Sequence, residues 1–168
     1  MGQYGTRANR ENLSAGGLTV TAYMNRLDEI IDIFRSVDPQ MRLRLLLDYS
    51  RKLPPLPEKY HALRDAGLNR VPECQTPVFL YMEPDNGSLL IHVDVAEEAP
   101  TVQGFLSLLI KAFAGASREE IARVPLELLQ LLGLADLLRM TRAVGLSAIL
   151  TRIKREAIRS GENGGLPH

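Results

Sequence analysis

The sequence is poor in the residue types that build disulfide or metal frameworks. Its 168 residues include one cysteine, three histidines and no tryptophan. A single cysteine excludes an internal disulfide and disfavours a cluster scaffold, which needs several thiolate ligands. The histidines His61, His92 and His168 lie far apart and lack the spacing of a zinc site. We therefore expect no bound metal, and a protein of a reducing compartment.

The sequence also lacks an excess of charge of one sign and any apolar run long enough to span a membrane. Twenty lysines and arginines balance twenty aspartates and glutamates, so no net field favours nucleic acid or an anionic membrane. The longest apolar runs, 105–116 and 126–138, are interrupted by polar or charged side chains, and neither could span a bilayer. Residues 1–17 lack the apolar segment of a secretion signal. These absences predict a cytoplasmic protein that binds neither nucleic acid nor membrane.

Most of the sequence has the pattern of amphipathic helices, and one pair of predicted strands interrupts it. Apolar residues recur at three- and four-residue steps over most of the sequence, which is typical of amphipathic helices. Residues 1–20 and 160–168 are rich in glycine and polar residues, and we predict that both are disordered tails around one domain at 21–159. The predicted helices span 22–37, 39–53, 58–66, 101–114, 117–124, 126–132 and 143–159.

The second predicted helix has a clear start but two candidate buried faces. Asp38 is a suitable N-cap, and Pro39 suits the first helical position. One apolar stripe consists of Met41, Leu45, Leu46 and Tyr49. In the alternative, Leu43 and Leu47 also face the core, and the helix is more buried than amphipathic.

Two strands are predicted, at 78–82 and 88–95. Asn86-Gly87 between them supplies the positive φ angles that a tight hairpin turn requires. Alternate residues of the second strand are apolar and should face the helices, whereas His92 lies on the opposite face. The apolar set is Leu89, Ile91, Val93 and Val95. The element order predicts an α+β fold, in which a small antiparallel sheet, a hairpin with or without a third strand, is packed on one face by helices.

The lone cysteine lies in a loop that proline makes stiff. Pro72 and Pro77 fix φ on either side of Cys74 and remove two backbone donors. A stiff loop that presents one thiol suits chemistry on a protruding group. The alternative is that Cys74 is a small buried hydrophobic residue, as most free cysteines are.

Five short segments occur in the order that is typical of one protein family. They are 53–56 (LPPL), 73–79 (ECQTPVF), 97–104 (EEAPTVQG), 132–134 (LGL) and 140–146 (MTRAVGL). Together, over about 27–157, they resemble the SufE family of sulfur acceptor proteins, which work with cysteine desulfurases in iron–sulfur cluster assembly. The chain departs from the family pattern where Glu73 replaces a glycine and Phe79 replaces a tryptophan.

The resemblance implies roles for five residues. It makes Cys74 the persulfide acceptor, with Arg142 as a nearby cation and Gln75 as a supporting residue. It also implies that Glu98 and Glu73 lie where a desulfurase docks. Because a carboxylate beside the sulfur would oppose a thiolate, we expect the side chain of Glu73 to point away from it.

The function that the resemblance implies is that of a sulfur carrier with a SufE/IscU-like fold, rather than an enzyme. Cys74 would take persulfide sulfur from a SufS-type cysteine desulfurase and pass it to an iron–sulfur scaffold complex. Pyridoxal phosphate belongs to the desulfurase, so we expect no cofactor in this chain. The alternative is a non-catalytic interaction module that regulates a desulfurase, with a structural Cys74. A thiol oxidoreductase is disfavoured because no resolving cysteine accompanies the thiol.

Overall fold

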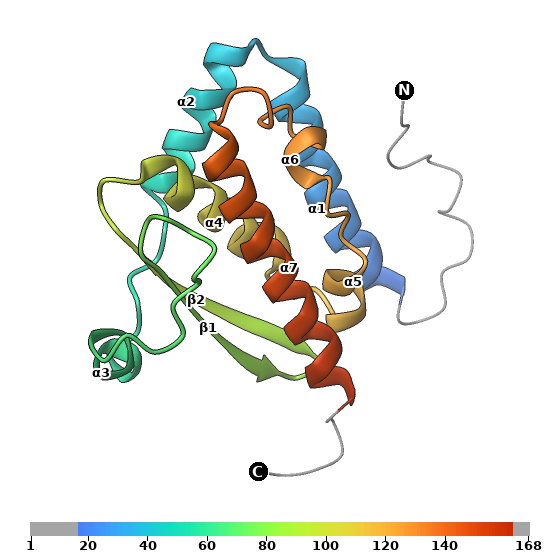
Figure 1. The fold of residues 1–168 in the computed structure, drawn as a ribbon. Helices are drawn as coiled ribbons and strands as arrows, with labels where there is room; N and C mark the ends of the chain where they lie inside the picture. Colours follow the sequence, from blue (N-terminus) through green and yellow to red (C-terminus); the bar gives the residue numbers. More distant parts are fainter. Residues whose placement is uncertain (1–16, 163–168) are drawn as a thin grey trace.

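The computed structural model describes residues 17–162 and the side chains of 26–159, and it confirms the α+β fold (Figure 1). The elements are α1 (Gly17–Ser36), α2 (Pro39–Ser50), the 3-10 turn η2 (Glu58–Tyr60), α3 (His61–Asp65), β1 (Val78–Asp85), β2 (Ser88–Val95), α4 (Pro100–Phe113), α5 (Arg118–Ala122), α6 (Leu128–Leu131) and α7 (Met140–Glu162). The predicted tails at 1–16 and 163–168 lie outside the described residues, whereas 17–20 and 160–162 are helical. No helix within 17–162 is long and apolar enough to cross a membrane.

The core is built around α4. This helix contacts α1, α2, α7 and β2, and its residues are buried on nearly all sides. Apolar residues cover most of its circumference and Lys111 is on the exposed side, so other elements have to enclose most of this helix. The longer helices lie together above the hairpin in Figure 1, with α7 running obliquely across the others.

Gly104 allows α2 and α4 to approach closely. A Cβ atom built on Gly104 would lie 2.1 Å from the carbonyl oxygen of Leu46 and 3.0 Å from its Cγ. Leu46 is fully buried at this crossing. Only a residue without a side chain fits there, so this glycine sets the distance between the two helices.

The hairpin is the one that the sequence predicts, with a longer first strand. Its antiparallel register runs from Val78 opposite Val95 to Asp85 opposite Ser88. Asn86 and Gly87 have φ angles of 48° and 84°, which matches the twist of a two-residue turn. The predicted apolar face is confirmed, because all four of its residues are buried: Leu89, Ile91, Val93 and Val95.

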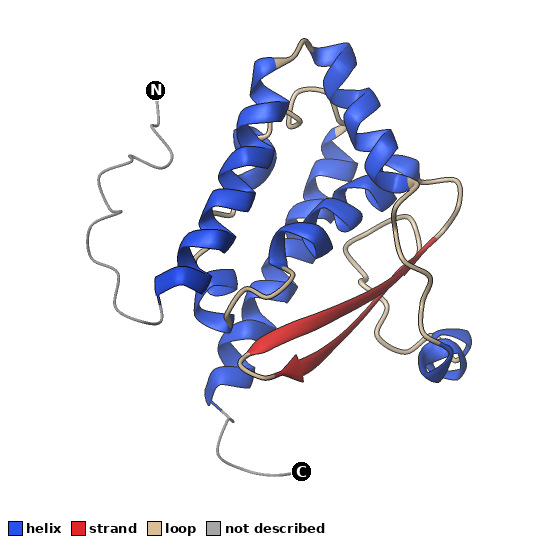
Figure 2. Cartoon of the chain, turned by 180° about the vertical axis from the view of Figure 1, so that it is seen from behind, coloured by secondary structure: helices blue, strands red, loops and turns tan. Residues whose placement is uncertain are grey.

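The second face of the hairpin is covered in part by η2 and α3, which lie on the opposite side from the helical layer (Figure 2). The Tyr60 ring stacks on the Tyr81 ring with centroids 4.5 Å apart, and it lies 5.4 Å from the ring of His92. His92 therefore lies on the face predicted for it. The chain that follows α3 pairs with β1 through a single bridge, Arg70 to Phe79, instead of forming a full third strand.

Two predictions about individual helices need correction. In α2 only Leu46 is fully buried, while Met41 and Leu47 are 38% and 37% exposed. The prediction that Met41 faces the core and the alternative that Leu47 does so are both wrong, because α2 packs mainly on one neighbour, α4. In α7 the helix begins at Met140 rather than 143, so that Arg142 lies in its first turn. The N-cap Asp38 is confirmed, since its side chain accepts from the Met41 amide.

Candidate functional site

The loop that carries Cys74 is tied down at both ends. Before the loop, the Val71 amide donates to the Val78 carbonyl at 2.8 Å and continues the short pairing with β1. Within it, the Cys74 amide donates to the Val71 carbonyl at 3.2 Å, which closes a tight turn. After it, the Ala96 amide donates to the Pro77 carbonyl at 3.4 Å and links the loop to the turn before α4. The loop 72–77 is therefore a short arch between two fixed points.

The thiol at the top of this arch points inward. Cys74 is 6% exposed and belongs to the buried core. Its Sγ rests on α7 at Gly145, where an added Cβ atom would lie only 2.9 Å from the sulfur. Gly145 is one of the residues in the 140–146 segment, and its missing side chain makes the recess that holds the sulfur.

The surroundings keep the thiol protonated at neutral pH. The pKa of Cys74 is raised from an ordinary 9.0 to about 11, mainly by burial, since a thiolate is poorly solvated there. The carboxylate of Glu73 contributes to the raised pKa, and the guanidinium of Arg152 opposes it. The side chain of Glu73, which was expected to point away from the thiol, therefore still raises the pKa of Cys74.

Arg152 is the functional candidate that the sequence analysis missed. Its Nε lies 3.7 Å from Oε2 of Glu73, and both side chains are partly exposed. It follows Gly145 by seven residues, which is two turns of α7, so that both lie on one side of the helix. This spacing was the available signal, but nothing in the sequence indicates that the cysteine loop packs along that side.

Arg142 binds a side chain of α4 and not the cysteine loop. Its Nη1 donates to Oγ1 of Thr101 at 3.0 Å, and the side chain is exposed. This bond joins the first turn of α7 to the first turn of α4. The structure thus brings Arg152, rather than Arg142, into the electrostatic surroundings of the thiol, because the first turn of α7 faces the start of α4.

The two remaining predicted residues are on the surface. Gln75, next to the thiol, is exposed, and so is Glu98 in the turn between β2 and α4. The bond from Ala96 to Pro77 places that turn beside the end of the cysteine loop. Glu98, the loop and the first turns of α7 therefore belong to one side of the molecule, as a docking role requires.

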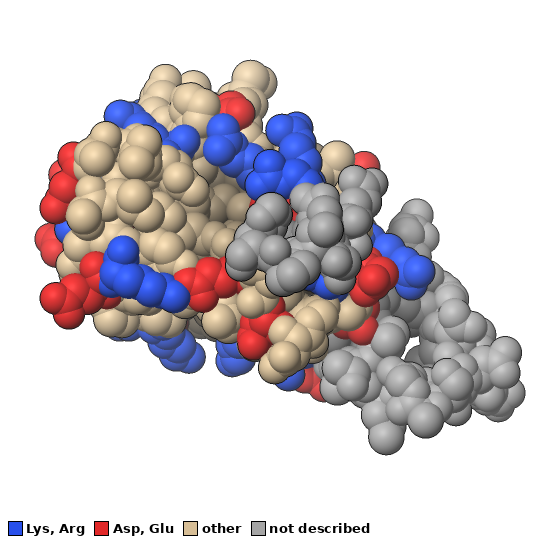
Figure 3. Space-filling model, turned by 90° about the horizontal axis from the view of Figure 1, so that it is seen from below, with Lys and Arg blue, Asp and Glu red and all other residues tan. Residues whose placement is uncertain are grey.

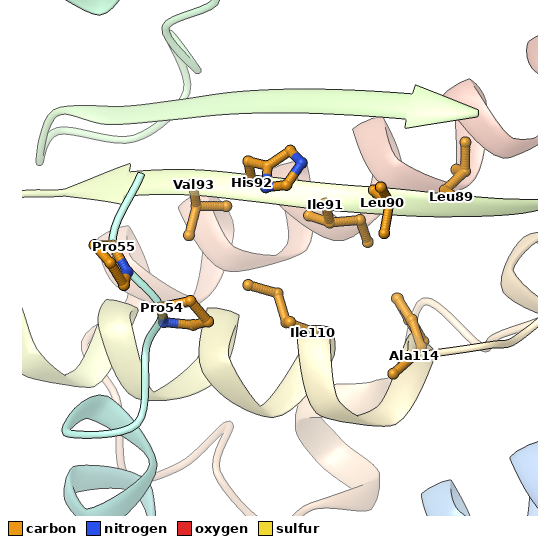
Figure 4. A pocket seen from close by; sticks show the side chains of 10 residues that line it. Pro54, Pro55, Leu89, Leu90, Ile91, His92, Val93, Ile110 and Ala114 are labelled. Atoms are coloured by element: carbon orange, nitrogen blue, oxygen red, sulfur yellow. The ribbon is translucent and has the colours of Figure 1, made fainter. Parts of the chain in front are cut away.

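A cavity of about 240 Å³ lies elsewhere, between β2, the second half of α4 and the prolines after α2 (Figure 4). Its lining is mostly apolar and includes Pro54, Leu90, His92 and Ile110, but not Cys74. The Nε2 atom of His92 is buried and has no hydrogen-bond partner among the described residues. Burial lowers the pKa of His92, so the ring is neutral at pH 7.

Charged side chains of both signs lie on the face shown in Figure 3. Several basic side chains gather in the upper part of that view, and acidic ones lie mainly to the left and below. Within the part of the chain that the structure describes, no three histidine, cysteine or acidic side chains come together as a metal site.

Gly145→Ala is expected to speed the alkylation of Cys74 about tenfold at pH 8, equivalent to one unit of pKa. The added methyl group has no space beside Sγ, so the thiol has to leave its recess. Iodoacetamide labelling followed by mass spectrometry measures the rate, and Val144→Ala is the control, because Val144 is 57% exposed on the neighbouring position. An unchanged rate in Gly145→Ala would mean that this glycine does not confine the sulfur.

Comparison with known proteins identifies this architecture. Residues 28–157 match the family model SufE, described as an Fe-S metabolism associated domain. An uncharacterized SufE-like protein of Mycobacterium tuberculosis is 38% identical over 130 residues, which are 77% of this chain and 89% of the relative. The cysteine desulfuration protein SufE of Plasmodium vivax is 24% identical over 143 residues, covering 83% and 55%.

A solved structure agrees with these matches. The solution structure of a hypothetical protein from Thermus thermophilus superposes with a TM-score of 0.71 at 31% identity. The superposition covers 82% of this chain and 96% of that one. The two chains therefore share most of the fold described above.

Proposed function

Since the chain belongs to the SufE family and has a role in Fe–S metabolism, we propose that it accepts sulfur from a cysteine desulfurase on Cys74 and delivers it for iron–sulfur cluster assembly. The observation that carries this proposal is the arrangement of the lone thiol: one cysteine, on a short arch, in a recess formed by a glycine. The name of the Plasmodium vivax relative, a cysteine desulfuration protein, supports a desulfurase as the partner. The chain itself supplies the carrier and not the desulfurase chemistry.

One thiol is sufficient for the transfer step. The Cys74 thiolate attacks the terminal sulfur of a persulfide on the desulfurase, and the sulfur–sulfur bond of that persulfide breaks. A new sulfur–sulfur bond forms on Cys74, and the desulfurase cysteine leaves as a thiolate. The proton of the Cys74 thiol is lost before the attack. No oxidant or reductant is consumed, so neither a second cysteine nor a metal is required in this chain.

The resting geometry requires the loop to move before this step. A thiol that is 6% exposed cannot reach a sulfur on another protein, and a pKa of about 11 leaves little thiolate at neutral pH. Displacement of the loop 72–77 from α7 would expose the sulfur and lower the pKa of the thiol, because it brings the sulfur into water or into the partner's site. The surface around the loop, including Glu98 and the first turns of α7, is where we place the desulfurase.

The experiment that tests the proposal is intact-protein mass spectrometry. The full chain is incubated with a SufS-type desulfurase and free cysteine, and the expected result is a mass increase of one sulfur atom that dithiothreitol removes. Omission of the desulfurase is the control. A chain that never gains the sulfur, while the same desulfurase loads another acceptor, would contradict the proposal.

A second function is favoured by one observation, the burial of Cys74. Packed on Gly145 with its proton retained, the side chain also fits a structural cysteine in a module that binds and regulates a desulfurase. In that case the desulfurase turns over faster when this chain binds, but no sulfur appears on Cys74. Variants that lack the Cys74 thiol distinguish the two functions.

Glu98→Arg is expected to change the apparent Kd for the desulfurase by about fivefold, with a stronger dependence on salt than in the parent chain. The residue is exposed beside the end of the cysteine loop, so a reversed charge acts at the edge of the docking surface. Titration by fluorescence anisotropy at two salt concentrations measures the effect. Asp85→Arg is the control, because Asp85 lies at the opposite end of the hairpin from the loop. A fall in melting temperature with an unchanged Kd would show that Glu98 only supports the start of α4.

A further inference from the structure

Two consecutive residues of the cysteine loop contact the same helix at two points. The sulfur of Cys74 packs on Gly145, while the carboxylate of Glu73 pairs with Arg152 at 3.7 Å. Seven residues separate the two positions on α7, which is about 10.5 Å along the helix axis. The side chains of Cys74 and Glu73 therefore contact α7 at two separate places, Cys74 at Gly145 and Glu73 at Arg152.

Glu73 is unfavourable for the chemistry proposed for its neighbour. A thiolate, and afterwards a persulfide anion, has to form on Cys74, and a carboxylate on the adjacent residue repels both. A fixed cation that binds this carboxylate would decrease the repulsion. Arg152 is in the right place for this, because its guanidinium contacts Glu73 from the helix on which the thiol rests.

We propose that Arg152 is a positioning residue for sulfur transfer, which holds the carboxylate of Glu73 on α7 and away from the sulfur of Cys74. This role rests on the proposed function, because it concerns the anions that Cys74 forms as a sulfur carrier. Arg152 acts mainly through Glu73, in addition to the direct attraction of its charge for the thiolate, and need not touch the transferred sulfur. Its removal frees the carboxylate to turn toward the thiol.

The other charged groups near the loop are otherwise engaged or directed outward. Glu73 from the loop and Arg152 from α7 are the charges that act on the Cys74 thiol. Arg142, three residues before Gly145, is bonded to Thr101. Glu98, from the turn before α4, is exposed. The Glu73–Arg152 pair is itself partly exposed, so that its effect is screened by water and amounts to a few-fold change in rate.

The same ion pair has a second interpretation with the opposite consequence. If it were a latch that keeps the loop closed, breaking it from either side would release the thiol and accelerate its modification. In the positioning role, loss of Arg152 slows modification, because the freed carboxylate disfavours the thiolate. The sign of the effect of Arg152→Ala therefore separates the two roles.

The test is a double-mutant cycle on the full chain without any partner. Four proteins are compared: the parent, Arg152→Ala, Glu73→Gln and the double variant. Iodoacetamide labelling of Cys74 is followed from pH 7 to 10.5. The expected results are that Arg152→Ala slows labelling about threefold at pH 8 and moves the profile to higher pH, and that Glu73→Gln accelerates it about threefold. When Glu73→Gln is already present, Arg152→Ala should slow labelling by less than about twofold, because only the direct attraction between the guanidinium and the thiolate is then lost.

Two further variants separate charge from helix effects. Arg152→Lys should restore most of the parent rate, because an ammonium group also attracts the carboxylate. Arg155→Ala removes an exposed arginine from the next turn of α7 and should leave the profile unchanged. Equal effects of Arg152→Ala with and without Glu73→Gln, or faster labelling when Arg152 is removed, would overturn the positioning role.

Sulfur loading gives a readout that separates this role from the proposed function. With a desulfurase and cysteine, Arg152→Ala should load sulfur about threefold more slowly than the parent, and the double variant should load it at least as fast as the parent. If no protein of the set takes up sulfur, the proposed function fails, while the labelling cycle still decides whether Arg152 controls Glu73. If all load at one rate, the positioning role is overturned and the carrier function stands.

Discussion

Cys74→Ser is expected to abolish sulfur loading of this chain completely. It should also remove the increase in desulfurase turnover that comes from transfer of sulfur to Cys74. A serine hydroxyl is not ionised at neutral pH and forms no bond that stores transferable sulfur, so the chain loses its only acceptor. Binding to the desulfurase should remain, because the surrounding surface is unchanged. Mass spectrometry of the chain and alanine release by the desulfurase measure the two losses.

The buried position of the thiol calls for a second variant. A hydroxyl in the recess at Gly145 costs about 1–3 kcal/mol if it finds no hydrogen-bond partner, so Cys74→Ser can lower the melting temperature for reasons unrelated to transfer. Cys74→Ala carries no polar group and serves as the matched control. Stimulation that persists at the parent level in both folded variants would establish the regulatory module and reject the carrier.

Gly104→Ala is expected to destabilise the protein by about 3 kcal/mol, although alanine is the better helix former by about 1 kcal/mol. The added Cβ would lie 2.1 Å from a backbone carbonyl oxygen of α2, so the two helices have to separate and the packing around Leu46 is lost. Urea unfolding followed by circular dichroism measures the change.

The control for this substitution is a second glycine at the end of the same helix. Gly115 has a φ angle of 77° and nothing within 4 Å of an added Cβ, so Gly115→Ala should cost only the conformational strain, about 1 kcal/mol. Equal losses in the two variants would mean that the contact at Gly104 has little energetic weight.

The sequence was sufficient for features that depend on local chemistry. A serine three residues before a glutamate is the sequence signature of a capping box, and Ser117 and Glu120 form one at the start of α5, where each side chain accepts from the other's backbone amide. The hairpin turn at Asn86 and the buried face of the second strand also follow from local patterns, and the structure agrees with both. The five short segments between 53 and 146, taken together in their order, were enough to predict the family, which the family model confirms.

What the sequence did not reveal depends on contacts between distant segments. Glu73 and Arg152 are 79 positions apart, and only the path of the loop along α7 brings them together. Arg142 was expected at the thiol, but the direction of a side chain in a first helical turn is fixed by its tertiary neighbour, here Thr101. Met41 has the period of a core residue, yet it stays partly exposed, because α2 packs mainly on α4 alone.

The glycine recess under Cys74 also couples proton release to a change of shape. The sulfur holds its proton with a pKa of about 11 in the recess, against 9.0 for an ordinary thiol, so ionisation weakens the closed arrangement by roughly 3 kcal/mol. Below pH 9 the neutral thiol experiences no such penalty and the loop stays closed; between pH 9 and 11 the closed form becomes progressively less favourable. By the same linkage, a partner that draws the loop outward at neutral pH would lower the pKa of the Cys74 thiol. In the sulfur-acceptor role proposed above, this linkage keeps the closed Cys74 thiol in its less reactive, protonated form until a partner opens the loop.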